Sequence, residues 1–334
     1  MGNKKSLYKA NQAKNDEYYT LYEDIADEIP KYAKQLKGKR IICPCDWDES
    51  YDEEIVFLSE KNVKSQILFA KDGTIKNVDI NATKQKIEKD LNLIKCQFVR
   101  FLVAHADVYE IESISVSGYN PVTNEGVRFQ DIDYSKYDLV ITNPPFSLFR
   151  DFIDVMFKNN VQFLVIGPIT ALTYKDIFSH IKKNELWLGY ASQLSGLKLP
   201  DGTILYSKNS EGSVPRACKW YTNLDVKYRH DKMILTEKFD PLKYPKYYNY
   251  DAVDVNKTNK IPYDYEGEMG VPVSFITKFN PDQFEIIGKG VDLSKTKRFT
   301  GDKAALWIEK DGKPYKEPFE RFVIKNREPI KDDD

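Results

Sequence analysis

The chain has 334 residues, which is enough for one large catalytic domain and a smaller second domain. Its 50 basic and 51 acidic residues give a net charge of −1, so any nucleic-acid-binding surface must be a local patch. The longest apolar run, Phe163 to Leu172, is too short to cross a bilayer, and no signal peptide is visible. These features predict a cytoplasmic protein.

The cysteines and histidines indicate neither a disulfide framework nor a metal site. Four cysteines without framework spacing suit a reducing cytosol, and three scattered histidines form no ligand-like cluster, so no metal is expected. Cys43-Pro44-Cys45 is a candidate nucleophile motif, because cytosine-C5 methyltransferases attack the base with a cysteine that follows a proline. In that family a glycine-rich loop comes first, and no such loop precedes Cys43 here. Buried core cysteines are therefore the favoured interpretation.

The N-terminal third predicts a tail followed by a helix and two strands. Residues 1–15 are polar and lysine-rich, which predicts a mobile basic arm. Apolar residues recur at helical spacing from Ile25 to Leu36. Arg40–Asp46 is expected as the first strand of a doubly wound, mostly parallel α/β sheet, and Gln66–Ala70 as the second. Residues 74–126 alternate charged and apolar stretches and are expected to form an insertion.

The centre of the chain reads as strand, rigid turn and helix. Leu139–Ile141 predicts a buried strand, which must end at Pro144-Pro145 because neither proline has an N–H for the sheet. Helical spacing of apolar residues resumes at Ser147. This arrangement places Asn143 and Phe146 at the carboxyl end of a strand, where open α/β sheets bind ligands.

Further elements flank this centre. A helix is expected over Leu172–Ile181 and a mobile loop or hairpin over residues 191–216. The remaining strands are expected at Val127–Ile132, Phe163–Pro168, Glu185–Tyr190 and Ala217–Asn223.

Asn-Pro-Pro-Phe suits chemistry on an exocyclic amine of a nucleobase. Such an amine is a poor nucleophile because its lone pair is delocalised into the ring, and two acceptors aimed at its hydrogens would offset the developing positive charge. The Asn143 side-chain oxygen and the Pro144 carbonyl can supply these acceptors, preset by the fixed φ of consecutive prolines. Phe146 offers a stacking face worth roughly 1–3 kcal/mol. The alternative, a strand end with Phe146 in the core, is less favoured because a strand precedes the motif and an amphipathic helix follows it.

The same residues carry a resemblance. Asn143-Pro144-Pro145-Phe146 resembles motif IV of amino-methyltransferases that use S-adenosylmethionine. Four segments of the chain together resemble the EcoRI-type DNA adenine methyltransferase family: NPPFSLF, NLD at 223–225, YPKYYNYDAVDVNKTNKIP at 244–262 and MGVPVSFITKFNPDQFE at 269–285. The similarity runs from Asp16–Tyr22 to about residue 290. It implies a class I methyltransferase-like sheet of seven strands, completed by a hairpin of the sixth and seventh.

The resemblance also implies a site for S-adenosylmethionine. In the family the segment before the first strand lines the methionine end of the cofactor, so Tyr19 and Thr20 are candidates, although aromatic packing explains a tyrosine equally well. In the family, the acid at the position of Asp131 accepts a hydrogen bond from the cofactor's adenine amine. The alternative is that Asp131 is simply a turn residue. Asn143 is expected to border the cofactor as well.

Two further cofactor candidates follow strands. The turn Cys45-Asp46 lacks the usual glycines, a departure that the EcoRI-type family shares, and Asp46 is a candidate partner for the cofactor's ammonium. An N-cap of the helix expected from Tyr51 is the alternative for that acid. Asp72 is the nearest candidate for the ribose hydroxyls, although Asp72-Gly73 is also a turn signal.

Residues 225–334 are expected to recognise the DNA target. Lysines and arginine that can contact phosphate alternate with tyrosines that can stack over residues 227–250, and a solvated loop is the alternative. The candidate DNA-binding residues are Lys227, Arg229, Lys243, Lys246, Tyr247 and Tyr248. Short strands are expected at Val271–Ile276, Phe284–Ile287, Ala304–Ile308 and Phe322–Ile324.

Together these features predict a catalytic domain over residues 16–224 that methylates N6 of a flipped-out adenine in double-stranded DNA. Cytosine-N4 methylation is the nearest alternative, because that amine is chemically alike, although that family more often begins the motif with Ser. A protein-glutamine methyltransferase would not need the basic, aromatic C-terminal part. A non-catalytic DNA-binding protein with a relic methyltransferase fold is the alternative from another class. The sequence leaves open whether a cognate restriction endonuclease acts separately as a partner, and which site is recognised.

Overall fold

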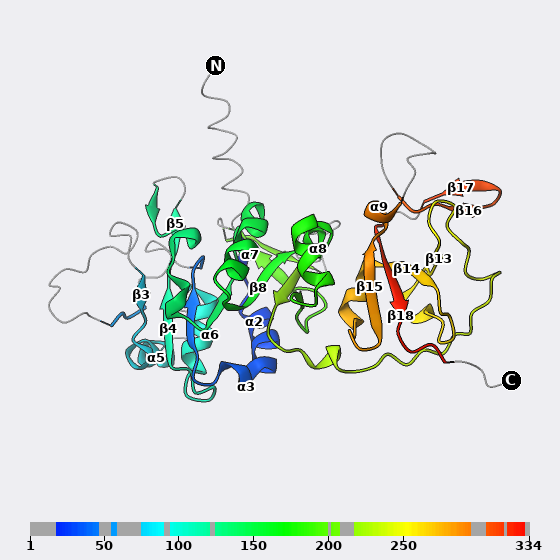
Figure 1. Ribbon diagram of the computed structural model, residues 1–334. Coiled ribbons are helices and arrows are strands. Elements are labelled where there is room, and N and C mark those ends of the chain that lie inside the picture. Colours follow the sequence, from blue (N-terminus) through cyan, green and yellow to red (C-terminus); the bar gives the residue numbers. More distant parts are fainter. Residues whose placement is uncertain are drawn as a thin grey trace, which may run out of the picture. The chain divides into compact units, whose positions relative to one another are not determined.

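The computed structural model describes residues 18–46, 55–58, 75–89, 94–120, 124–199, 202–207, 217–294, 305–316 and 319–330. The chain divides into two units (Figure 1). The first comprises Met1–Ala171 with Leu188–Leu224, and the second comprises Leu172–Trp187 with Asp225–Asp334. The helix expected after the fifth strand, α8 (Lys175–Lys182), belongs to the second unit and not to the catalytic domain in which it was expected.

The first unit is built on a seven-stranded sheet with the order β3-β4-β2-β7-β8-β12-β9. Its strands are β3 (Lys76–Asn77), β4 (Ser113–Val116), β2 (Arg40–Cys43), β7 (Leu139–Thr142), β8 (Gln162–Pro168), β12 (Cys218–Thr222) and β9 (Trp187–Leu188). The pairs β2–β4, β2–β7 and β7–β8 are parallel, whereas β3 and β12 pair antiparallel with β4 and β8. The predicted mixed α/β class with a seven-stranded, mostly parallel sheet is therefore confirmed.

The central strands are apolar on both sides because helices lie on both faces of the sheet. Successive residues of a strand point to opposite faces. On β12, Trp220 meets Phe98 of α6 (Gln97–Ala104) at 6.1 Å, and the next residue, Tyr221, meets Phe149 of α7 (Phe149–Lys158) at 4.9 Å between ring centroids. The strands β2 and β7 accordingly read as continuous apolar runs.

The predicted strand, turn and helix at the centre of the chain are confirmed. The strand β7 ends one residue before Asn143, the 3-10 helix η4 (Phe146–Leu148) follows the prolines, and α7 continues from Phe149. The apolar face of α7 is buried, but Leu148, expected on that face, is 38% exposed because it lies in η4 before the α-helix begins. The leading helix is also confirmed, as α2 (Tyr22–Glu28), η1 (Ile29–Tyr32) and α3 (Ala33–Leu36).

Two predictions for residues 74–132 are wrong. Part of the expected insertion belongs to the sheet, because α5 (Ile80–Lys89), α6 and the internal strand β4 lie within residues 74–126. The expected strand Val127–Ile132 is instead the 3-10 helix η2 (Phe129–Asp131), since its buried residues, Phe129 and Ile132, are three apart. Between these segments, β5 (Tyr119–Asn120) pairs with β6 (Glu125–Gly126). The predicted strand Gln66–Ala70 lies outside the described residues.

A small second sheet of this unit joins a strand near the start of the chain to two strands from residues 191–216, where a mobile loop or hairpin was expected. Its strands are β1 (Tyr19–Thr20), β10 (Gly196–Lys198) and β11 (Ile204–Tyr206), which pair antiparallel in that order. Buried carboxylates of α2 hold the segment before β10. Glu28 accepts hydrogen bonds from the backbone of Tyr190 and Ala191, both at 2.7 Å, and Asp24 accepts one from Ser195 N at 2.6 Å. Burial raises the pKa of both carboxyls.

The second unit contains a four-stranded sheet with the order β13-β14-β18-β15 (Figure 1). Its strands are β13 (Val253–Asp254), β14 (Glu268–Pro272), β18 (Arg321–Asn326) and β15 (Phe284–Lys289), and β16 (Ile308–Lys310) forms a separate hairpin with β17 (Lys313–Tyr315). The strand expected over Val271–Ile276 ends at Pro272, beyond which η9 (Val273–Lys278) begins. The described residues of this unit also form the α-helices α8 and α9 (Gly290–Leu293), and Phe178 of α8 packs on Phe322 at 5.0 Å between ring centroids.

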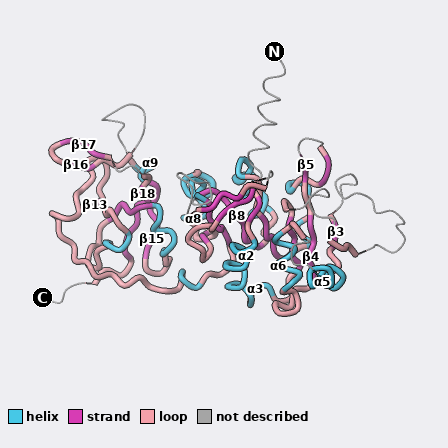
Figure 2. The backbone as a smooth tube through the Cα atoms, turned by 180° about the vertical axis from the view of Figure 1, so that it is seen from behind, coloured by secondary structure: helices cyan, strands magenta, loops and turns pink. Residues whose placement is uncertain are grey.

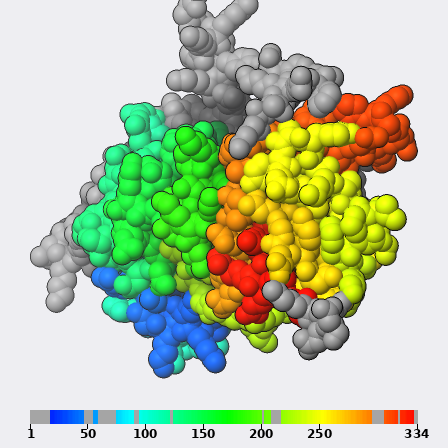
Figure 3. Space-filling model, turned by 45° about the vertical axis from the view of Figure 1, so that its right-hand side comes forward, coloured from blue at the N-terminus to red at the C-terminus, as the bar shows by residue number. Residues whose placement is uncertain are grey.

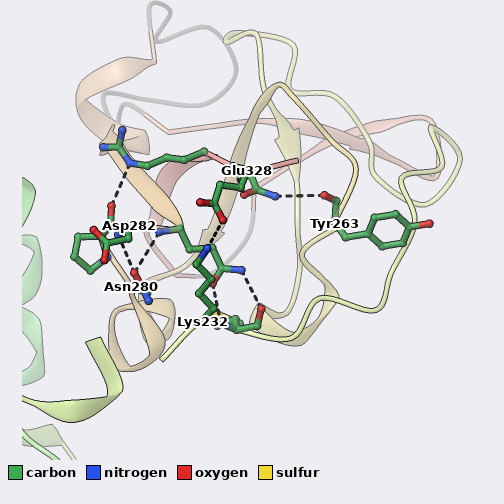
Figure 4. Close-up of polar contacts among 10 residues, drawn as sticks. Lys232, Tyr263, Asn280, Asp282 and Glu328 are labelled. Carbon is green, nitrogen blue, oxygen red and sulfur yellow. Dashed lines mark hydrogen bonds and ion pairs between the residues drawn. The ribbon is translucent and has the colours of Figure 1, made fainter. Parts of the chain in front are cut away.

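Much of residues 230–266 is loop (Figure 2), and side-chain hydrogen bonds hold its start to the sheet. Gln283 accepts a hydrogen bond from Met233 N at 2.7 Å and donates one to Met233 O at 2.9 Å. Lys232 forms an ion pair with Glu328, and Asn280 accepts from Asp282 N at 2.8 Å (Figure 4). Within the described part of the chain, no helix is long and apolar enough to span a membrane.

Candidate active site

The side chain of Asn143 is fixed at the carboxyl end of β7. Its backbone N–H donates to Asp46 Oδ1 at 3.2 Å, and its side-chain Nδ2 donates to the carbonyl oxygen of Tyr18 at 2.6 Å. The side-chain Oδ1 is buried, and no described group donates a hydrogen bond to it. Buried polar atoms are normally paired, so an unpaired acceptor at a strand end is a candidate for contact with substrate.

Asp46 reaches this corner from the neighbouring strand β2. Because β2 and β7 are adjacent and parallel, their carboxyl ends lie together, and Asp46 accepts hydrogen bonds from Thr142 Oγ1 and Asn143 N. Burial raises the pKa of Asp46 to about 7. The two hydrogen bonds lower this pKa, but their effect is smaller than that of burial. Both carboxylate oxygens of Asp46, the acid expected to pair with the cofactor's ammonium, therefore already accept a hydrogen bond, one from Thr142 and one from Asn143. The expected helix start near Tyr51 lies outside the described residues.

The aromatic end of the motif is paired with Tyr18. Pro144 is buried, Pro145 and Phe146 are half-buried, and the Phe146 ring stacks on Tyr18 with centroids 5.6 Å apart and an interplanar angle of 28°. Tyr18 therefore touches both ends of the motif, Asn143 through its carbonyl and Phe146 through its ring. Sequence reasoning missed Tyr18. The tyrosine-rich string that begins at Asp16 was the only signal.

Two buried hydroxyls lie near the same edge of the sheet. Thr20 Oγ1 and Ser117 Oγ have no hydrogen-bond partner among the described residues. Ser117 follows β4, and its N–H donates to Cys43 O at 3.0 Å, so it lies at the carboxyl ends of β4 and β2. Sequence reasoning missed Ser117, because it assigned β4 to an insertion. Recognising Ser113–Gly118 as a strand of the main sheet would have found it.

The other described residues predicted to bind the cofactor are more exposed to solvent than Asn143. Tyr19 and Cys45 are half-buried, and Asp131 is exposed in η2. Asp72 lies outside the described residues. Burial and the nearby Asp46 raise the pKa of Cys43 and Cys45 well above the usual thiol value, which keeps both protonated and therefore poor nucleophiles.

The candidate DNA-binding residues separate into exposed and buried groups. Lys227, Lys243, Lys246 and Tyr248 are exposed. Arg229 is 5% exposed: its guanidinium lies 3.5 Å from the centre of the Trp187 ring and donates to Asn184. Tyr247 is also buried, and its hydroxyl donates to Asp254 in the core. Burial argues against direct DNA contact for Arg229 and Tyr247. The segment around residue 250 lies at the surface of its unit (Figure 3).

No group of three or more His, Cys, Asp or Glu side chains that could hold a metal ion occurs in the part of the chain that the structure describes.

The fold and this corner define the class of the protein. A seven-stranded, mixed sheet with Asn-Pro-Pro-Phe at the carboxyl end of a central strand is the arrangement of an enzyme that transfers a methyl group to an amine. Comparison with known families gives the particular one: the family model of the adenine-specific methyltransferase EcoRI matches residues 6–327. The chain belongs to this family, as its sequence motifs predicted, and the family implies S-adenosylmethionine as the methyl donor.

Three curated relatives bear names of the same kind. The chain is 35% identical to the Type II methyltransferase M.EcoRI of Escherichia coli, over 86% of this chain and 90% of the relative. It is 31% identical to the Type II methyltransferase M.MgeORF184P of Mycoplasma genitalium and 32% identical to M.MpnI of Mycoplasma pneumoniae, each over 84% of both chains. No solved structure matches the chain.

Proposed function

We propose that this protein is a site-specific DNA methyltransferase that modifies N6 of adenine in double-stranded DNA, as part of a restriction-modification system. Membership of the adenine-specific family and the Type II names of three relatives support this function. The observation that carries it in the structure is the buried, unpaired Oδ1 of Asn143, an acceptor with no donor among the described residues.

The chemistry follows from the corner at Asn143. An adenine inside a duplex cannot enter the site, so it must first be rotated out of the stack. Its ring would stack on Phe146, while Asn143 Oδ1 and the Pro144 carbonyl accept the two hydrogens of N6. These acceptors hold the amine in place and offset the positive charge that develops on it. The hydrogen bonds of Asp46 keep Asn143 in place before the base arrives, so little reorganisation is needed.

The residues at the same edge suit S-adenosylmethionine, which supplies an electrophilic methyl group. The buried hydroxyls of Thr20 and Ser117 have no hydrogen-bond partner among the described residues, and a ribose or carboxylate can provide one. The family resemblance implies that Tyr19 lines the methionine end, and we assign Cys45 and Asp46, which follow β2, to the same wall. Asp131 and Asp72 remain candidates for the adenine amine and the ribose. The arrangement of the sheet also suits a doubly wound fold, in which ligands bind at this edge.

Residues 225–334, which make up most of the second unit, are the proposed target-recognition region. Its exposed cations Lys227, Lys243 and Lys246 suit phosphate contacts, and exposed Tyr248 suits stacking. Within the described part of the chain, Lys246 forms an ion pair with Asp251 at 3.8 Å, and Tyr248 donates to Glu309 at 2.5 Å. Contact with a duplex would compete with both interactions.

The test is expression in a host that lacks DNA methylation, followed by modification-sensitive sequencing of its genome. We expect N6-methyladenine at one recurring sequence, and no modification from an Asn143→Ala variant expressed to the same level. Modification at cytosine N4 would refute the adenine assignment and favour the alternative amine. If the wild-type protein gives no modification, calorimetric titration with S-adenosylmethionine decides further: absence of binding would favour a non-catalytic relic.

A further inference from the structure

We infer that Tyr18 is a positioning residue for the transfer: its carbonyl orients the Asn143 side-chain amide with the oxygen toward the substrate amine, and its ring, stacked on Phe146, holds that carbonyl in place. This inference rests on the proposed function and deepens it. It concerns residues of the first unit only.

The two ends of the Asn143 side-chain amide differ in what they can bind. A side-chain amide carries an acceptor oxygen and a donor NH2 group, and only the oxygen can receive a hydrogen from an amine. In the structure Nδ2 donates to Tyr18 O at 2.6 Å, which leaves Oδ1 unpaired. If the amide were reversed, Oδ1 would face the Tyr18 carbonyl, and two acceptors would repel each other. The Tyr18 carbonyl therefore selects the orientation in which Asn143 can bind an amine.

Contacts on both sides of Tyr18 keep its carbonyl in place. The Tyr18 ring stacks on Phe146, three residues beyond Asn143, so one residue touches both ends of the motif. On the other side of Tyr18, the strand β1 pairs with β10, with Tyr19 opposite Lys198 and Thr20 opposite Leu197. The ring and the strand together fix the peptide from two directions.

The strand β10 is itself firmly held. Leu197 is fully buried, and Asp24 accepts hydrogen bonds from Ser195 N at 2.6 Å and Gly196 N at 3.4 Å. Gly196 lies so close to its neighbours that a Cβ there would meet Leu205 O at 2.9 Å. Because the segment is packed in this way, the position of Tyr18 is set by the fold before any substrate binds.

The contact with Tyr18 makes an aspartate unfavourable at position 143. An aspartate would offer acceptor oxygens to the substrate amine, but it would lose the NH2 group that donates a hydrogen bond to Tyr18 O. Its carboxylate would then face the Tyr18 carbonyl, and the two acceptors would repel each other unless the carboxylate were protonated. We therefore expect Asn143→Asp to transfer methyl groups slowly, with its rate relative to wild type rising as the pH is lowered.

The test compares Tyr18→Ala with the conservative Tyr18→Phe in single-turnover methylation of a duplex that contains the recognition site. Misplacing a reacting group by about 1 Å costs on the order of 100-fold in rate. We expect Tyr18→Ala to lower the transfer rate about 10- to 100-fold. Its affinity for S-adenosylmethionine and its thermal midpoint should stay close to wild type. Tyr18→Phe, which keeps the stacked ring, should restore the rate.

The outcomes separate this inference from the proposed function. Wild-type protein that methylates adenine, together with a Tyr18→Ala variant of undiminished rate, would overturn the inference and leave the function intact. If wild-type protein methylates no adenine, the function itself fails. If Tyr18→Ala does not fold, Asn143→Asp decides: a wild-type rate at neutral pH would show that the Tyr18 carbonyl does not select the amide.

Discussion

Replacement of Asn143 by alanine tests the central chemistry. The substitution removes the unpaired Oδ1 acceptor and the Nδ2 donor to Tyr18, but it keeps the backbone N–H that bonds to Asp46. Thr142 also keeps its hydrogen bond to Asp46, so the backbone of the corner should hold its shape. The variant should therefore fold and bind S-adenosylmethionine almost as the wild type does.

The expected loss in rate comes from transition-state stabilisation. Removal of one preorganised polar group that faces developing charge typically costs about 100- to 1000-fold in kcat, or about 2.7–4 kcal/mol. Loss of the hydrogen bond to Tyr18 should separately lower the free energy of unfolding by roughly 1 kcal/mol. Hence we expect a fall in kcat of at least about 100-fold with little change in stability.

The assay is single-turnover transfer of a labelled methyl group to a duplex, with calorimetry for cofactor affinity. Asn159→Ala is the matched control, because Asn159 Nδ2 also donates to a backbone carbonyl, that of Val155 at 2.9 Å, but on the exposed end of α7. The control should transfer at the wild-type rate. Near-normal turnover by Asn143→Ala would refute the mechanism, and a loss of cofactor binding in that variant would show that the corner had collapsed.

Three further changes test other parts of the site and fold. Phe146→Ala removes a stacking face worth about 1–3 kcal/mol and should weaken binding of duplexes with a flipped base, measured by 2-aminopurine fluorescence. A loss of rate as large as that of Asn143→Ala would mean that stacking dominates. Because burial raises the pKa of Asp46 from 3.8 to about 7, the folded state binds the proton more tightly, and this group's contribution to stability should decline as the pH rises through that interval. In urea unfolding, Asp46→Asn should lack this decline; an unchanged pH dependence would contradict the assignment. Arg229→Ala should lower the free energy of unfolding by about 2 kcal/mol or more, because the guanidinium lies on Trp187 away from water. The salt dependence of DNA binding should stay unchanged, and a shallower slope would show that Arg229 contacts phosphate.

The sequence by itself determined the motif and the elements that present it. Apolar runs of β-branched residues marked β2, β7 and β8, and the two prolines marked the end of β7, because these signals depend on neighbouring residues alone. The same local logic predicted the acceptor roles of Asn143 and Pro144. The extended match to the EcoRI-type family then predicted the membership that the family comparison confirmed.

Only the tertiary structure decided which distant residues complete the corner. Tyr18 lies 125 residues from Asn143 and Asp46 lies 97 residues from it, and the parallel strands and the small β1–β10 sheet bring them together. The place of β4 beside β2, and with it the position of Ser117, depends on strand order, which no local pattern encodes. For the same reason the lysine- and tyrosine-rich stretch gave no sign that Arg229 is buried. A cation buried against Trp187 looks the same in sequence as one exposed to phosphate, because its partner is set by long-range packing.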